Sequence, residues 1–248
     1  MGVVGIILAG GSGSRLYPVT KYVSKHLLPI YNKPMIYYPL SVLVSAGIKN
    51  VLIITNPPDL KIYRKVLGRG TKLGVSIKYL VQKKPLGIAE AFVIGKNFIK
   101  KNRVALILGD NVFFGKNFIF KLKKASKMKE SVIFLKKVNN PERFGVAHLN
   151  RNKEIIKIKE KPKSPKSNYA VTGLYFYSND VINFAKKLKP SKRGELEITD
   201  INNIYLKLKK LKNFILDKNF IWKDAGTFDS LLDISVLIKK HYSKRNNT

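Results

Sequence analysis

The chain has 248 residues, of which 45% are hydrophobic, and this suits one compact globular unit. It has no cysteine, which excludes disulfides, thiolate catalysis and cysteine-ligated metal centres. Its formal net charge of +33 comes mainly from 40 lysines dispersed along the chain, without a basic amphipathic tail or an RNA-recognition aromatic motif. We therefore expect no nucleic acid as its main partner. No apolar run approaches the ~20 residues that span a membrane, so we expect no membrane association and a cytoplasmic location.

The first half alternates short apolar runs with helical patterns. We expect strands at residues 3–8, 51–55, 76–81 and 104–108, and helices at residues 35–46, 59–67 and 88–99. Strands that alternate with helices at this spacing favour a mostly parallel sheet with helices on both faces. Ligands of such sheets bind beyond the carboxyl ends of the strands.

The second half has a different pattern. Strands joined by hairpins are expected at residues 132–138, 145–149, 154–160 and 170–177. Helices follow near residues 180–188 and 197–209, then a short strand at 220–224 and a closing amphipathic helix at 228–242. The predicted fold class is α/β: a Rossmann-like, mostly parallel mixed sheet flanked by helices, with an inserted, smaller antiparallel lobe that faces the substrate.

A glycine-rich turn follows the first predicted strand. Main-chain N–H groups of such a turn, at residues 10–14, can reach an anionic ligand, and Arg15 and Lys25 add fixed positive charge nearby. The segment matches neither the Walker A motif nor the dinucleotide-binding fingerprint. A purely structural turn therefore remains an alternative.

Two aspartates follow predicted strands. Asp110 lies at the end of the strand 104–108, and Asp224 lies far along the chain in Trp222–Thr227. Carboxylates at strand ends suit Mg²⁺, which takes oxygen ligands from one or two carboxylates and from substrate phosphates. Turn or capping chemistry is the alternative for both residues.

Other charged segments, taken alone, are weaker evidence for a catalytic or binding role. Glu160 and Lys161 follow a strand, and the acidic side chains in Arg193–Asp200 can equally be the favourable charges of a helix N-terminus. The three histidines, His26, His148 and His241, have no metal-ligand spacing.

Taken together, ordered segments along nearly the whole chain resemble the sugar-phosphate nucleotidyltransferases. These segments are Gly5–Leu16, Lys25–Pro29, Lys33–Ile36, Leu108–Asn111, Pro141–Val146, Glu160–Lys163, Tyr169–Tyr177, Arg193–Asp200 and Trp222–Thr227. The resemblance implies a nucleotide-diphospho-sugar transferase fold in a single domain, with a nucleotide-binding core at about 1–110 and a sugar-binding part at about 111–228. It also implies thymidylyl transfer from dTTP to glucose 1-phosphate with Mg²⁺, which gives dTDP-glucose and pyrophosphate and supplies pathways such as that to dTDP-rhamnose.

The same resemblance implies a role for each matching residue. Five residues would be catalytic: Arg15, Lys25, Asp110, Lys161 and Asp224, with Asp110 and Asp224 holding the metal. The nucleotide would contact Leu8, Gly10, Gly11, Ser12, Gly13, Ser14, Arg15, Lys25, Gln82 and Gly87, the last two reading the base. The sugar phosphate would contact Asn111, Gly145, Glu160, Lys161, Val171, Tyr175 and Arg193.

The chain departs from the family pattern at several positions. His26 and Glu90 stand where many relatives have Gln, Leu86 stands where they have Asp, and Phe228 stands where they often have His. The chain also ends soon after its last predicted helix, like the short form of the family, so we expect weak or absent feedback inhibition by dTDP-rhamnose at a second site. A homo-oligomer, dimer or tetramer, is usual in the family.

Three alternatives remain open. The same chemistry with UTP or another hexose 1-phosphate is the nearest, because thymine and uracil share the edge that Gln82 can read and differ by a methyl group worth ~1 kcal/mol. A non-catalytic paralogue is disfavoured because the charged set of five is retained. A nucleic-acid binder would show salt-sensitive binding and no pyrophosphate release.

Overall fold

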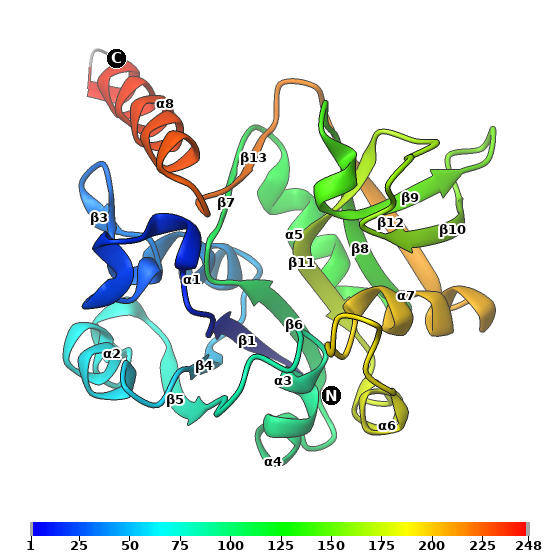
Figure 1. The fold of residues 1–248 in the computed structure, drawn as a ribbon, viewed down its shortest axis with the longest axis horizontal. Coiled ribbons are helices and arrows are strands. Elements are labelled where there is room, and N and C mark those ends of the chain that lie inside the picture. Colours follow the sequence, from blue (N-terminus) through cyan, green and yellow to red (C-terminus); the bar gives the residue numbers. More distant parts are fainter. Residues whose placement is uncertain (1, 247–248) are drawn as a thin grey trace.

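The computed structural model describes residues 2–246 and shows one nine-stranded mixed sheet with helices on both faces (Figure 1). Two small two-stranded sheets lie beside it. Within the described range, no helix is both long and apolar enough to cross a membrane.

The parallel part of the large sheet comes from the first half of the chain. Its strands are β1 (Val3–Ala9), β4 (Asn50–Thr55), β5 (Ser76–Val81) and β6 (Arg103–Leu108), in the spatial order β5-β4-β1-β6. The side chains of β1 are apolar and buried toward both faces of the sheet. That explains its nearly continuous hydrophobic sequence, which is typical of a parallel strand covered on both sides.

The antiparallel strands extend this same sheet. The long strand β11 (Tyr169–Tyr177) pairs with β6 through its second half and with β9 (Gly145–Leu149) through its first residues. Strand β9 continues into β10 (Ile155–Glu160) by a hairpin. On its other side, β11 pairs with β8 (Ser131–Lys137), and β8 pairs in parallel with β12 (Leu211–Leu216).

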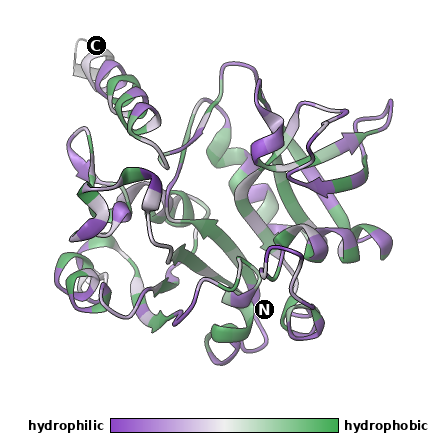
Figure 2. Ribbon diagram, viewed as in Figure 1, coloured by the Kyte–Doolittle hydropathy of each residue, from purple (hydrophilic) through white to green (hydrophobic). Residues whose placement is uncertain are grey.

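The helices form two layers over separate apolar cores. Helices α1 (Tyr37–Ser45), α2 (Leu60–Leu67) and α5 (Phe118–Lys127) pack on one face, against the side of β1 that carries Ile7. Helices α3 (Glu90–Ile94), α4 (Lys96–Ile99), α6 (Val181–Lys187) and α7 (Ile198–Lys207) pack on the face that carries Ile6. Figure 2 shows the central strands mainly as hydrophobic, which agrees with burial on both sides.

A third, smaller core joins the end of the chain to its beginning. Strand β13 (Ile221–Asp224) pairs with β7 (Asn111–Phe114), and the short strands β2 (Pro29–Ile30) and β3 (Lys33–Pro34) form a hairpin. The long helix α8 (Phe228–Asn246) packs its buried Ile234 and Ile238 against this region. In Figure 1, α8 lies at one end of the molecule, away from the large sheet.

The fold class is confirmed, two predicted details are wrong, and several elements were not predicted. The helix expected at 88–99 is two helices that meet at Gly95, where an added Cβ would lie 2.9 Å from the Ala91 carbonyl oxygen and 3.0 Å from Ile6. The four strands at 132–177 are not consecutive hairpins, because β11 lies between β8 and β9. Strands β2, β3, β7 and β12 and helix α5 were not predicted.

Candidate active site

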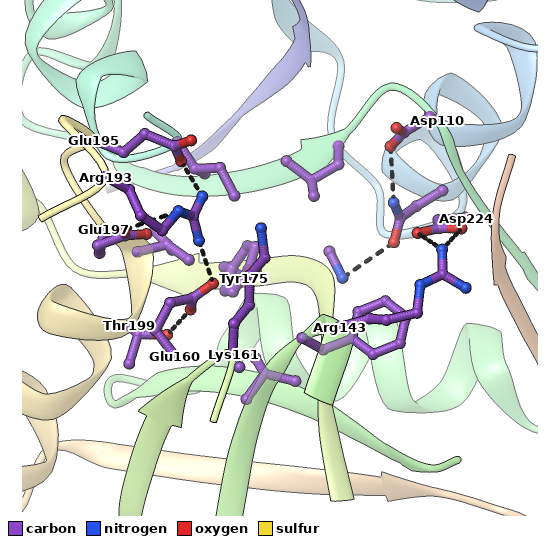
Figure 3. A pocket seen from close by; sticks show the side chains of 18 of the residues that line it. Asp110, Arg143, Glu160, Lys161, Tyr175, Arg193, Glu195, Glu197, Thr199 and Asp224 are labelled. Carbon is purple, nitrogen blue, oxygen red and sulfur yellow. Dashed lines mark hydrogen bonds and ion pairs between the residues drawn. The ribbon is translucent and has the colours of Figure 1, made fainter. Parts of the chain in front are cut away.

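A cavity of about 590 Å³ opens where the parallel and antiparallel parts of the large sheet meet. Its walls combine the carboxyl ends of β6, β10 and β13 with the middle of β11 and the loops before α7. The lining residues include Arg15, Asp110, Asn111, Arg143, Gly145, Glu160, Lys161, Val171, Tyr175, Arg193, Glu195, Glu197, Thr199, Trp222 and Asp224. Figure 3 shows their side chains in two groups on either side of Lys161.

The pairing of β13 with β7 brings the two predicted metal ligands together. Asp224 lies opposite Asn111 in the antiparallel register, and the Ala225 N–H donates to the Asp110 carbonyl oxygen at 2.8 Å. Two carboxylates more than a hundred residues apart in sequence therefore line one cavity.

Asp110 is held by an ion pair at the edge of the cavity. The Lys25 ammonium donates to Asp110 Oδ2 at 2.5 Å, and both side chains are mostly buried. Burial would raise the pKa of Asp110, but the charge of Lys25, the nearby His26 and the hydrogen bonds from Lys25 and Asn111 together outweigh it and lower the pKa to about 2. The carboxylate therefore stays ionised at neutral pH.

His26 lies behind this pair and is buried. Burial, followed by repulsion from Lys25, lowers the pKa of His26 to about 3, so its imidazole is neutral at physiological pH. Its ring packs against Gly109, the residue before Asp110. A Cβ added to Gly109 would lie only 2.8 Å from His26 Cδ2.

The Asn111 side chain links Asp110 to the neighbouring strands. Its Nδ2 donates to Asp110 Oδ1 at 2.9 Å, while its Oδ1 accepts from the Gly173 N–H at 3.1 Å and from Trp222 Nε1 at 2.7 Å. The amide is thus committed to three protein partners.

Asp224 has a cationic neighbour of its own. Arg143 Nη2 lies 3.4 Å from Asp224 Oδ1, on the side of the cavity opposite the Arg193 group (Figure 3). Arg143 belongs to the segment Pro141–Val146, but we predicted no role for it. Its position next to a predicted carboxylate ligand could be found only from the fold.

Arg193 is surrounded by three carboxylates. Its guanidinium lies 2.7 Å from Glu195, 3.5 Å from Glu160 and 3.8 Å from Glu197, measured to the nearest carboxylate oxygens. Glu160 also accepts a hydrogen bond from Thr199 Oγ1 at 2.5 Å. Of this group, the resemblance assigns Glu160 and Arg193 to the sugar phosphate.

Lys161 leaves the end of β10 in a left-handed conformation, with φ of 37°. Its N–H is anchored to the Phe144 carbonyl oxygen at 3.0 Å. Such a backbone is costly for a residue with a side chain and is often found at functional sites. It directs the ammonium between the Arg193 and Asp224 groups (Figure 3).

The glycine-rich turn lies at the carboxyl ends of neighbouring parallel strands. Gly11 exchanges two hydrogen bonds with the Asn56 side chain, and the Gln82 N–H donates to the Thr55 carbonyl oxygen. Of the predicted nucleotide contacts, only Arg15 lines the cavity. Arg15 lies against the loop after β13, since a Cβ on Gly226 would be 2.6 Å from Arg15 Nη2.

All the predicted sugar-phosphate residues line the cavity, and so do four of the five predicted catalytic residues. The fifth, Lys25, reaches it through Asp110. Leu8, Gly10–Ser14, Gln82 and Gly87 are not among the lining residues, although the Gln82 side chain lies near Gly10 and donates to the Gly87 carbonyl oxygen. Sequence reasoning missed Arg143, Trp222 and Thr199 as lining residues, and it gave Glu195 and Glu197 no defined role.

Comparison with known proteins gives a consistent result. The nucleotidyl transferase family model matches residues 4–241. The glucose-1-phosphate thymidylyltransferases of Neisseria meningitidis serogroup A and Mycobacterium tuberculosis H37Rv are 52% and 50% identical to the chain, over 95% of this chain and 82% of each relative.

Solved structures share the fold. A Bacillus anthracis candidate glucose-1-phosphate thymidylyltransferase, in complex with a sucrose, has a TM-score of 0.87 and 46% identity over 95% of this chain and 94% of that one. A UDP-glucose pyrophosphorylase complexed with UDP-glucose has a TM-score of 0.85 at 24% identity, over 97% and 100% of the two chains, and supports the fold alone. On the family match and on these relatives, the chain belongs to the nucleotidyl transferase family.

Proposed function

We propose that this enzyme transfers a thymidylyl group from dTTP to glucose 1-phosphate, which forms dTDP-glucose and releases pyrophosphate. The observation that carries the proposal is the shared cavity: Asp110, Asp224, Arg15 and Lys161 line one space beside the glycine-rich turn. The names of the relatives, which are about half identical to this chain, support the choice of substrates.

The chemistry to be catalysed is the approach of two anions. A sugar 1-phosphate is already ionised at neutral pH, so its oxygen can attack the α-phosphate of the triphosphate without a general base. The barrier lies in charge repulsion and in-line alignment, which positioned cations lower. In the proposal Lys25 meets the α-phosphate, Arg15 the leaving pyrophosphate, and Lys161 the sugar phosphate.

The residues present fit a magnesium ion. Asp110 and Asp224 supply two carboxylates in one cavity, and within residues 2–246 no cluster of three or more His, Asp or Glu side chains suggests an all-protein metal cage. Mg²⁺ is usually held by one or two carboxylates and substrate phosphates, which matches this donor set. When bound, it would neutralise phosphate charge, and the two aspartates would hold it.

The remaining predicted contacts divide into two sides of the site. On the nucleotide side, Leu8, the Gly10–Ser14 main chain, Gln82 and Gly87 hold the triphosphate and read the base. On the sugar side, Gly145, Glu160, Val171 and Tyr175 surround the hexose, with Asn111 close by and Arg193 as a further phosphate contact. The burial of Tyr175 and the placement of Glu160 on the cavity wall support this division.

A second candidate is the same reaction with UTP or another hexose 1-phosphate. The Gln82 side chain is the observation that keeps it open, because thymine and uracil present the same polar edge to it. The methyl group that separates them is worth only ~1 kcal/mol of burial.

The experiment is a substrate matrix with pyrophosphate release as the readout. Purified protein with Mg²⁺ is given dTTP, UTP, dCTP and ATP, each with glucose 1-phosphate, galactose 1-phosphate and mannose 1-phosphate. We expect the highest kcat/KM for dTTP with glucose 1-phosphate, and loss of that activity in the Asp110→Asn control, which excludes a contaminant. Preference for another pair, or activity that survives in the control, would refute the proposal.

We also propose that the enzyme is a homo-oligomer whose subunits pair through α8. Phe228, Leu232 and Val236 form an exposed apolar stripe on this helix, at 47%, 67% and 42% exposure, beside a hollow of about 400 Å³. If two copies of α8 pack antiparallel with Leu232 opposite Val236, Asp229 faces Lys239 of the partner by the same count. Such a two-fold contact is self-complementary in both apolar surface and charge.

A further inference from the structure

The Gln82 side chain has a defined orientation. It is buried at the end of β5, where its Nε2 donates to Glu90 Oε2 at 2.7 Å and to the Gly87 carbonyl oxygen at 3.3 Å. A carboxylate and a carbonyl can only accept hydrogen bonds. The chemistry of these two partners therefore fixes which end of the amide is the NH₂ group.

This orientation presents an acceptor to the nucleotide side of the site. A Cβ built on Gly10 would lie 2.9 Å from Gln82 Oε1, so the carbonyl end lies over the glycine-rich turn. Among residues 2–246, Gln82 Oε1 accepts no hydrogen bond from another side chain or N–H group. It is free to accept one from a ligand.

An acceptor at this point discriminates between pyrimidines. Thymine and uracil carry a hydrogen on N3 and can donate it to Gln82 Oε1. Cytosine has no hydrogen on N3, which is itself an acceptor, so two acceptors would face each other. Turning the Gln82 amide to suit cytosine would place its oxygen against the Glu90 carboxylate and the Gly87 carbonyl.

We infer that Glu90 is a positioning residue that locks the Gln82 amide and makes the enzyme select nucleotides with an N3–H, those of thymine and uracil, over those of cytosine. The inference rests on the proposed function, because it takes Gln82 as the residue that reads the base. It adds a residue, Glu90, that acts through Gln82.

The backbone that carries Glu90 is rigid. Glu90 begins α3, and its neighbours Ala89, Ala91 and Phe92 are fully buried in the core. The preceding loop is tied to the segment before α7, where the Leu196 N–H donates to the Leu86 carbonyl oxygen at 2.7 Å and the Ala89 N–H donates to that of Leu196 at 3.2 Å. These contacts hold the main chain of Glu90 in place beside Gln82.

The test compares kcat/KM for dTTP, UTP and dCTP, with glucose 1-phosphate and Mg²⁺, in the wild type and in Glu90→Gln. The glutamine can itself turn and donate to Gln82 Oε1, so it releases the lock while keeping size and shape. We expect the wild type to prefer dTTP over dCTP by ~100-fold or more, and the dTTP:dCTP ratio to fall at least ~10-fold in Glu90→Gln. Glu154→Gln, an exposed change at the β9–β10 hairpin, is the control and should keep the wild-type ratio.

Glu90→Ala provides a second test, since it removes the acceptor altogether and should also lower the ratio. A wild-type ratio in both variants would overturn the inference, and so would a wild type that uses dCTP as well as dTTP. A wild type that turns over no pyrimidine triphosphate would contradict the proposed function instead. Calorimetric binding of dTTP and dCTP would then decide the role of Glu90, with equal affinities counting against it.

Discussion

At the scale of single residues, the burial of His26 makes the stability of the fold depend on pH. Its pKa in the folded protein is lowered to about 3, while in the unfolded chain it is near the ordinary 6.5. Between these values the unfolded chain binds a proton that the folded protein does not, so acidification favours unfolding in this window. Asp110 makes no contribution to the pH dependence of stability above its ordinary pKa of 3.8, because it is ionised there in both the folded and the unfolded chain.

We therefore predict that His26→Gln weakens the acid sensitivity of the fold. Between pH 6.5 and pH 5, the wild-type free energy of unfolding should fall by about 1.7 kcal/mol more than that of the variant. Urea unfolding at several pH values measures this difference. Parallel pH profiles for the two proteins would show that His26 becomes protonated without cost in the folded state.

The sequence predicted the positions of several cavity residues at strand ends, while the roles proposed for them come from the family resemblance. Asp110, Glu160 and Lys161 each follow a strand, so their place at the strand ends could be inferred. Arg143 could not be assigned, because its neighbour Asp224 is 81 positions away and the two meet only through the pairing of β7 with β13.

At the scale of elements, the loop after β13 lies against the Arg15 guanidinium. Gly226 leaves room for the guanidinium, and an added methyl group would lie 2.6 Å from Arg15 Nη2. The clashing atom is the far end of a flexible side chain, so the backbone need not move.

We predict that Gly226→Ala folds normally but displaces Arg15, with a loss of roughly 10-fold or more in kcat. Arg15 is proposed to stabilise charge that grows on the leaving pyrophosphate, so the effect belongs mainly to the chemical step. Steady-state kinetics measure the loss in kcat, and a thermal melt tests whether the variant folds normally. Gly2→Ala is the control, because its added Cβ would make only an ordinary 3.7 Å contact. Unchanged kcat in Gly226→Ala would refute this role of the glycine.

The strands and helices that were predicted best are those specified by local pattern. Residues 76–81 and 145–149 match β5 and β9 to the residue, since turn residues bound both. The break at Gly95 was not predicted, and the contact of this position with β1, where an added Cβ would lie 3.0 Å from Ile6, is visible only in the fold. Strand β12 was missed because its six residues become a strand by pairing with β8, from a segment some eighty positions earlier.

At the scale of the whole molecule, α8 is the exposed element that carries the proposed subunit contact. We predict that the wild type elutes as a dimer or tetramer in size-exclusion chromatography with light scattering, and that Leu232→Glu halves its mass without unfolding it. Burying an unpaired charge in the centre of a small apolar interface costs more free energy than the interface contributes to association.

Phe120→Glu is the matched control, because Phe120 is a 71% exposed apolar residue on α5, outside the α8 stripe. Its mass should equal that of the wild type.

Asp229→Lys should weaken the assembly, and adding Lys239→Asp should restore it. A monomeric wild type, or a Leu232→Glu variant of unchanged mass, would exclude the proposed contact.

The hydrogen bonds that tie Leu86 and Ala89 to Leu196 have a consequence for anyone who redesigns this enzyme. They join two stretches, one beside the proposed base contacts and one beside the proposed sugar contacts. We expect a mutant library that changes residues 193–199 to accept new sugar 1-phosphates to alter nucleotide choice as well. Both stretches should be randomised together, and each selected clone should be screened against the full set of triphosphates.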